Sequence, residues 1–268
     1  MTLETSTGVI KPKINIESDQ AIRQKIQAEL AELGIPECPP EIINHLILLE
    51  KNSNFNDDSR SIIEGIKNVL ELETSFKLRP IEKQRVILAT YLSDIGKSHS
   101  LEVTKLFSVE NIEDENQTVG ETLQTYFPVE KEEMIANLRN VGVNSDMSMR
   151  EFWDKHASWT KIILDKYTHL FDKETRIIAA SHHLDHGINP YEINVNDIEQ
   201  ISNGEKFSIF LLMALDKYQA LRRRSKKNHK EAMESLKVIF GQYDGDAIMR
   251  LIITTIDQLG ATDSLFKE

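Results

Sequence analysis

The amino-acid sequence predicts an all-α protein. Apolar residues recur at helical spacing along most of the 268-residue chain, and strand-like alternation with hairpin dipeptides is nearly absent. Hydrophobic residues make up 40% of the chain, which is enough to bury a substantial core at this length. We therefore expect a helical bundle.

The composition also excludes several classes of protein. The formal net charge of -11 argues against general nucleic-acid binding, which needs a basic face to neutralise phosphates. Cys38 is the only cysteine, so the chain has no internal disulfide and no cysteine metal cluster. No apolar run is long enough to span a bilayer, and the N-terminus lacks the apolar segment of a signal peptide. We expect a cytoplasmic protein that does not interact with membranes.

Residues 1–54 are predicted to form an N-terminal extension with a flexible start and two helices. The first helix has a cap at Ser18 or Asp19 and ends at the Gly and Pro residues of GIPECPPE. The second helix runs from about residue 41 to residue 51. The extension is thus separate from the domain that follows.

Residues 55–260 are predicted to form the main domain. NSNFNDDSR is predicted to be a loop, and Asp58 or Ser59 caps a helix that ends near residue 72. Ser148 and Glu151 have the spacing of a capping box before EFWDKHASWTKIILDKY. Further helices are predicted over residues 81–94, 173–183, 204–224, 230–240 and 244–259.

Two segments fall outside this helical pattern. Residues 99–147 are polar and acidic, and we interpret them as an insertion with one or two short helices that serves as a lid or a protein-partner surface. Residues 261–268 form a tail.

Three of the predicted helices carry metal-ligating side chains within apolar runs. One helix is apolar around most of its circumference and ends at Asp94. Another ends with the adjacent histidines His182 and His183, and in a third Asp216 interrupts the run FSIFLLMALDKYQAL. Because an unpaired buried carboxylate is costly, such acids are normally paired or bound to metal.

Each of these residues also has a simpler explanation when it is taken alone. Asp94 could bond to a loop, the histidine pair could favour a helix dipole, and Asp216 could pair with Arg or Lys. Imidazoles and carboxylates together, however, make a site for Fe, Mn or Zn. Their joint occurrence favours one shared metal centre.

The order of these motifs resembles the HD superfamily of metal-dependent phosphohydrolases, and most closely its HD-GYP branch. YLSDIGKS is similar to the family's LLHDIGKI, which places Asp94 on the HD aspartate and Lys97 on the lysine that follows. MREFWDKHASWTKIIL resembles the helix E-x-x-x-x-x-H-P-x-x-G-x-x-I-L, which places His156 on a metal-ligand histidine.

Three later segments extend the resemblance. IIAASHHLDHGINPY resembles the His-His element that precedes the GYP signature, which gives His182 and His183. LLMALDKYQALRRRSKK resembles ILAVADVYDALTSDRPYK, which places Asp216 on the last metal-binding aspartate, and GQYDGDAIMRLI resembles the family's closing G-x-x-F-D-P-x-V-V-x-A-F. The resemblance implies an HD-domain helical bundle that binds one or two divalent transition-metal ions, Fe or Mn or alternatively Zn, with Asp94 as the bridge.

The chain departs from the family pattern at three places. Ser93 replaces the HD histidine, and Asp58 in DDSRSII aligns with the first ligand histidine, for which His45 is the other candidate. The period of IINHLILLE favours a core or surface role for His45. HHLDHGINPY lacks the glutamate after the histidines and the Gly-Tyr-Pro signature that accompanies cyclic di-GMP hydrolysis.

The resemblance implies a phosphohydrolase or phosphodiesterase acting on a nucleotide or cyclic dinucleotide. In this interpretation Asp94 and Lys97 are catalytic, with Lys97 neutralising developing phosphoryl charge. The basic tract RRRSKK suggests that Arg222, Arg223 and Arg224 bind the substrate, although a solvated helix end explains the tract equally well. The alternative function is a catalytically inactive module that binds a nucleotide or a protein partner.

Overall fold

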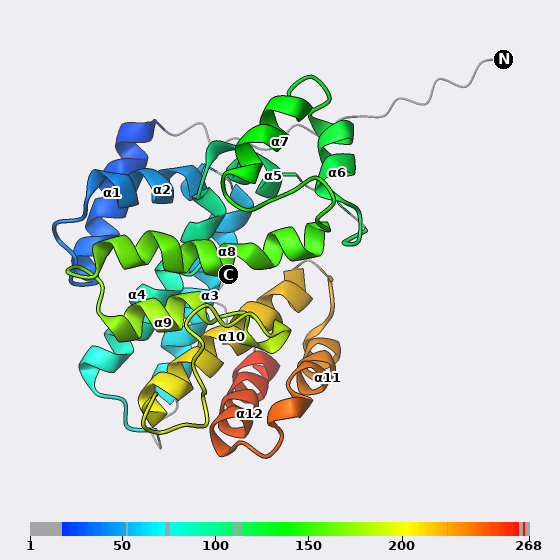
Figure 1. Cartoon of the computed structure of the whole chain (residues 1–268). Coiled ribbons are helices and arrows are strands. Elements are labelled where there is room, and N and C mark those ends of the chain that lie inside the picture. The colour runs from blue at the N-terminus through cyan, green and yellow to red at the C-terminus, as the bar shows by residue number, and fades with distance from the viewer. Residues whose placement is uncertain are drawn as a thin grey trace.

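The protein is all-helical, as predicted (Figure 1). The computed structural model describes residues 18–51, 53–72, 76–109, 112, 114–223, 225–262 and 265, with the backbone alone at 53–58. Within these ranges, no helix combines the length and the apolar character needed to cross a membrane.

Eight of the helices, together with the last turn of a ninth, pack around one large hydrophobic core, in which N-terminal and C-terminal helices meet. The helices are α1 (Asp19–Glu32), α2 (Pro40–Glu50), α3 (Ser53–Leu72), α4 (Pro80–Leu92), α9 (Lys173–Ala180), α10 (Asn203–Arg223), α11 (His229–Ile239) and α12 (Ala247–Ala261). Ile22 and Ile26 of α1 and Ile42 of α2 belong to this core. The two N-terminal helices therefore pack as part of the main bundle.

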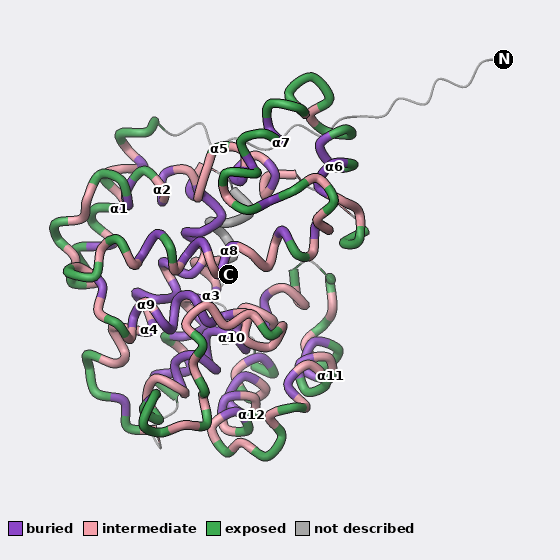
Figure 2. The backbone as a smooth tube through the Cα atoms, in the orientation of Figure 1, coloured by how far each residue is buried: buried purple, intermediate pink, exposed green. Residues whose placement is uncertain are grey.

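Helices α4 and α10 are central, as their apolar circumference predicts. All residues from Phe207 to Leu215 of α10 are buried. In α4, Val86, Ala89 and Leu92 are fully enclosed. Figure 2 shows the buried backbone of these helices in the middle of the molecule. Polar residues of the candidate site lie just beyond the buried apolar stretches of these two helices.

Two predicted boundaries are wrong. Helix α3 begins at Ser53, so residues 53–60 of the segment NSNFNDDSR are helical and not a loop. This segment contains neither Gly nor Pro, and polar residues alone do not end a helix. Helix α9 ends at Ala180, so the histidine pair lies beyond it, in a turn that leads to the 3₁₀ helix Leu184–His186 and to Gly187 at φ +78°.

The described residues of the insertion form three short helices where one or two were predicted: α5 (Leu101–Phe107), α6 (Val119–Tyr126) and α7 (Lys131–Arg139). They enclose a second hydrophobic core with residues such as Leu106, Leu123 and Leu138. Buried residues of helix α8 (Met149–Leu164) pack against these three helices and complete that core. The insertion is therefore a packed subdomain on one end of α8, as Figure 1 shows.

Helices α6 and α8 begin side by side. Thr118 and Ser148 are their N-caps, both complete a capping box with a glutamate three residues later, and the two caps pair in an isolated β-bridge. The Ser148 capping box was predicted. The backbone N–H of Val119 donates to the Met147 carbonyl at 2.8 Å. These bonds fix the insertion to the start of α8.

Helix α8 links the two hydrophobic cores. Phe152 and Trp159 pack in the core of the insertion, whereas Ile163 and Leu164 pack in the main core. His156 lies between Phe152 and Trp159 along the helix and is buried. Its ring contacts Phe107 of the insertion on one side and His182, which follows α9 of the main bundle, on the other, so the helix places His156 at the junction of the two cores.

Candidate metal centre

Three segments of the chain meet at this junction and form the candidate site. Asp94 precedes the 3₁₀ helix η1 (Ile95–Ser98), which packs against α8. His156 projects from α8, and His182 and His183 lie in the turn after α9. The structure thus brings together four of the predicted site residues from three separate segments.

The three imidazoles converge through their Nε2 atoms. Nε2 of His156 lies 2.8 Å from Nε2 of His182 and 3.3 Å from Nε2 of His183. A carboxylate oxygen of Asp94 is 3.2 Å from the same atom of His156. Ligands at 2.0–2.1 Å from a tetrahedral zinc ion are separated by roughly 3.3 Å, so these spacings suit one shared ion.

The tautomers of two of the imidazoles follow from their backbone contacts. Nδ1 of His156 contacts the Trp153 carbonyl, and Nδ1 of His182 contacts the Ala179 carbonyl at 2.7 Å. A carbonyl oxygen only accepts, so each Nδ1 carries a proton and each neutral ring points a bare Nε2 lone pair at the other. Such a pair needs a positive charge between the rings, either a metal ion or a proton.

The electrostatics keep His182 and His183 neutral and the Asp94 carboxylate charged. Burial lowers the pKa of His182 to about 4 and holds the pKa of His183 well below its usual range. Burial alone would raise the pKa of Asp94, but the Lys97 ammonium outweighs it and holds that pKa well below normal. Neutral imidazoles and an ionised carboxylate are the forms that bind metal.

Lys97 lies directly against Asp94. Its Nζ is 2.6 Å from Oδ2 of Asp94, whereas His156 approaches the other oxygen, Oδ1. Phe107 of the insertion covers this pair, with its ring 5.9 Å from the Lys97 ammonium and 5.7 Å from the His156 ring. The insertion therefore supplies one wall of the site.

Unsatisfied polar atoms gather in the turn that carries the histidine pair. Among the described residues, the buried side-chain nitrogen and oxygen atoms without a hydrogen bond are Ser181 Oγ, His183 Nδ1 and both carboxylate oxygens of Asp185. Oδ2 of Asp185 does have ion-pair contacts, with His186 and Lys217. Buried polar groups are normally satisfied, so this concentration indicates a place where the chain contacts a ligand or ordered water.

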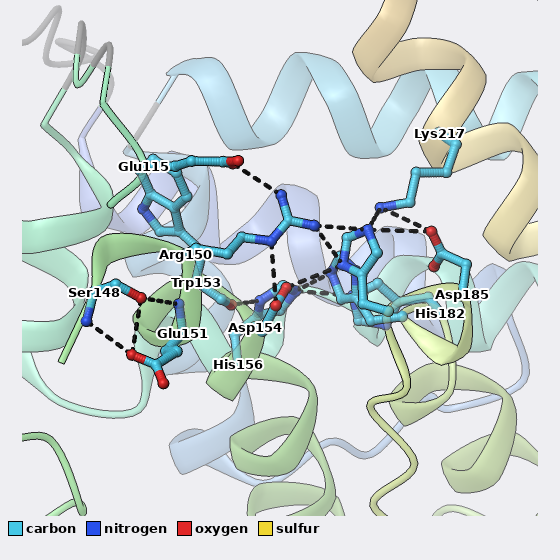
Figure 3. Close-up of polar contacts among 12 residues, drawn as sticks. Glu115, Ser148, Arg150, Glu151, Trp153, Asp154, His156, His182, Asp185 and Lys217 are labelled. Carbon is cyan, nitrogen blue, oxygen red and sulfur yellow. Dashed lines mark hydrogen bonds and ion pairs between the residues drawn. The ribbon is translucent and has the colours of Figure 1, made fainter. Parts of the chain in front are cut away.

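A second polar cluster, which the sequence did not predict, adjoins the histidine pair (Figure 3). We call it the His186 cluster; it consists of Arg150, Asp154, Asp185, His186 and Lys217. The His186 ring stacks on the His183 ring with centroids 5.2 Å apart. Its Nδ1 lies 3.1 Å from Asp154 and its Nε2 lies 3.1 Å from Asp185. Asp154, His183 and His186 form a second group whose ligand atoms are close enough to hold a metal.

The other predicted site residues are not part of the imidazole cluster. Asp216 is near enough to His182 to raise its pKa, but no hydrogen bond or ion pair joins it to the imidazoles in the described part of the chain. Ser93 donates its hydroxyl to the Thr90 carbonyl at 2.9 Å. His45 contacts the Ser98 carbonyl at 2.9 Å, which agrees with the packing role that its helical period favours.

The predicted substrate-binding arginines lie further along α10. Arg222 donates to the Tyr218 hydroxyl at 3.3 Å and lies over that ring. Arg222 lies six positions after Asp216, or about 9 Å further along the helix. The side chain of Asp58 and all of Arg224 lie outside the described residues.

Comparisons with known proteins identify no relative of this chain: no protein-family profile, no curated protein and no solved structure matches it.

Proposed function

We propose that this protein is a metal-dependent phosphohydrolase or phosphodiesterase that acts on a nucleotide or cyclic dinucleotide. The observation that carries the proposal is the convergence of three Nε2 atoms and the Asp94 carboxylate at one buried point. The order of its motifs, which resembles the HD-GYP branch, supports the same reaction class. Asp94, His156, His182 and His183 would hold a divalent Fe, Mn or Zn ion, with Asp216 as a further ligand from α10.

A bound ion in this site would supply a water of lowered pKa and would polarise a phosphoryl oxygen. The chain's own residues prepare the site for that chemistry. The Trp153 and Ala179 carbonyls orient two of the imidazoles, and Lys97 keeps Asp94 ionised. The Lys97 ammonium, beside Asp94, would also stabilise negative charge that develops on a phosphoryl group.

A specific observation favours the alternative function, a catalytically inactive module that binds a nucleotide or a protein partner. The Ser93 hydroxyl is used within its own turn, and the Lys97 ammonium already contacts one oxygen of Asp94. The site therefore offers fewer ligands than the family pattern implies, which limits the ion at the family's first metal position. The role of residues 99–147 as a protein-partner surface stays a prediction.

Metal content and turnover together test the proposal. Protein purified without chelator should contain Fe, Mn or Zn, and the double variant His182→Ala, His183→Ala should lose it. The exposed His169→Ala provides a matched control. Turnover should then be measured with Mn or Fe under reducing conditions on cyclic dinucleotides, linear dinucleotides, nucleoside triphosphates and a generic phosphodiester.

We expect slow hydrolysis of at least one substrate, and its loss in Asp94→Ala. Metal content that is unchanged by the double histidine variant would contradict the metal centre. Tight binding of one nucleotide without turnover above the Asp94→Ala level would decide for the inactive module.

A further inference from the structure

The His186 cluster has more positively charged donors than its central ring can accept. Nζ of Lys217 lies 2.7 Å from Nε2 of His186, and Nη2 of Arg150 lies 2.9 Å from the same atom. A neutral imidazole has one acceptor nitrogen and a protonated one has none. Nη2 of Arg150 is nearly as close to Nδ1 of the ring, at 3.0 Å, so it lies over the ring face and has no acceptor there.

The carboxylates of the cluster do not remove this excess. Asp154 accepts from Nε of Arg150, and Glu115 accepts from Nη1, so neither is the partner of Nη2. Lys217 is closer to the His186 ring than to Asp185, whose nearest oxygen is 3.4 Å away. Both cations can therefore donate to a further acceptor, and Figure 3 shows Arg150 and Lys217 extending toward the same place from two different helices.

The cluster also lies between solvent and the imidazoles of the metal centre. The exposed fraction of the side chain is 41% for Arg150 and 20% for His186, but only 4% for His156 and 2% for His182. The His186 ring stacks on His183, which in turn contacts His156. A ligand that enters along this path would meet Arg150 before it meets the buried imidazoles.

We propose that Arg150 and Lys217 form an anion subsite that holds a phosphate group of the ligand beside the metal centre. The inference rests on the proposed function, because the phosphate belongs to the same ligand. The Arg150 guanidinium offers the fork geometry that suits phosphate oxygens, and the Lys217 ammonium adds a point charge. The subsite replaces the predicted Arg222–Arg224 tract as the place where substrate charge is neutralised.

The same residues argue against a second metal ion in the His186 cluster. A divalent cation on Asp154, His183 and His186 would lie next to the ammonium of Lys217 and the guanidinium of Arg150. Both cations would have to move away, at the cost of their contacts with Asp154 and Asp185. An anion would accept hydrogen bonds from both cations in the positions that they already occupy.

Inorganic phosphate is the probe for a binding experiment on the full chain. Calorimetric titrations at low ionic strength would compare metal-free and Co²⁺-loaded protein, since Co²⁺ content is readily quantified. The variants are Arg150→Gln, Lys217→Gln and the conservative Arg150→Lys, with Lys155→Gln as a control on the same helix as Arg150. Circular dichroism and thermal melting establish that each variant is folded.

We expect each Gln variant to weaken phosphate binding about ten-fold, because a hydrogen bond to a charged group is lost. Arg150→Lys should recover part of the affinity, and Co²⁺ content and Lys155→Gln should match the wild type. Unchanged phosphate affinity in both Gln variants would overturn the subsite. So would a second equivalent of Co²⁺ that is lost in Asp154→Asn.

The two proposals can fail separately. If wild-type protein binds no metal but binds phosphate through Arg150 and Lys217, the proposed function falls and the anion subsite stands. If metal-dependent hydrolysis is found but the phosphate affinity does not change when Arg150 or Lys217 is replaced, the subsite is wrong and the proposed function stands. Absence of phosphate binding in both forms of the protein overturns the subsite.

Discussion

Gly96 lies directly against the backbone of His156. A Cβ atom at position 96 would be 2.0 Å from the His156 carbonyl oxygen and 2.7 Å from the Thr160 nitrogen. The Gly96 N–H donates to the Thr160 hydroxyl at 3.1 Å, and that hydroxyl donates to the Ser93 carbonyl at 2.8 Å. This close approach lets the turn that carries Asp94 reach the face of α8 that carries His156.

The first prediction is that Gly96→Ala destabilises the protein and separates the ligands. The new Cβ would meet backbone atoms, which cannot yield as a flexible side chain can, so we expect a loss of about 3 kcal/mol in the free energy of unfolding. Denaturant unfolding and metal content are the measurements. Gly241→Ala is the control, since no atom lies within 4 Å of its added Cβ. Equal stability of the two variants would show that Gly96 is not packed against α8.

The second prediction concerns His182→Leu, which removes one of the two facing lone pairs. Leucine fills the buried space without a polar group, so the metal-free variant should be at least as stable as the metal-free wild type. The wild type should gain about 2.7 kcal/mol when metal is present at 100 times its dissociation constant, and the variant should gain much less. Thermal melting with and without metal measures both effects. A metal-induced shift of equal size in the two proteins would exclude His182 as a ligand.

The sequence predicts the helices that bury apolar surface, because their period is set by the core. The apolar circumference of α10 correctly predicts its central place, with residues 207–215 buried. Helix α3 was predicted to start too late because Asn, Asp and Ser favour turns as readily as helix ends. In the insertion, the paired caps Thr118 and Ser148 depend on a contact between distant segments, which local patterns do not show.

The same distinction applies to the candidate site. Asp94 and the histidine pair stood out because they are polar residues beside apolar runs. Arg150, His186 and Lys217 did not, since a charged residue in a polar segment has the same sequence pattern whether it faces solvent or another side chain. The spacing of Arg150 and Asp154, four residues apart on one helix face, was the available signal, and it is usual for surface ion pairs.

The third prediction is that Lys97→Met destabilises the metal-free protein. Only 10% of the Lys97 side chain and 14% of the Asp94 side chain are exposed, so the variant leaves a buried carboxylate without its closest cation. Breaking a buried ion pair costs about 3 kcal/mol. A bound divalent ion should restore most of this loss by taking over the neutralisation of Asp94. Chemical unfolding with and without metal tests this, with the more exposed pair of Lys161 and Asp165 broken by Lys161→Met as the control.

The fourth prediction concerns acid stability at Asp172, the N-cap of α9. Burial would raise its pKa, but bonds from Thr175 and the Arg85 guanidinium outweigh burial and lower it below the normal 3.8. A lowered pKa gives stability that is present above the unfolded-state value and is lost as the pH falls through the folded-state value. Asp172→Asn should therefore reduce the acid dependence below about pH 4, by less than about 1 kcal/mol because the side chain is partly exposed. Unfolding curves between pH 2 and pH 6 decide this, with the exposed Asp146→Asn as the control.

The last prediction tests the family resemblance at its clearest departure. Ser93 stands where the HD pattern has a histidine, and it directly precedes Asp94. If the site is a divergent HD centre, Ser93→His should add an imidazole next to Asp94 and raise the metal content per chain. Ser93 is buried and its hydroxyl is used within its own turn, so the larger ring should also cost about 1–3 kcal/mol of stability. Ser93→Phe separates the two effects, because it adds similar bulk without a ligand. We expect bound metal and hydrolysis to rise in the His variant alone. The same metal content in both variants would mean that position 93 does not face the metal centre. The alignment of Ser93 and Asp94 with the family's His-Asp pair would then no longer support the resemblance.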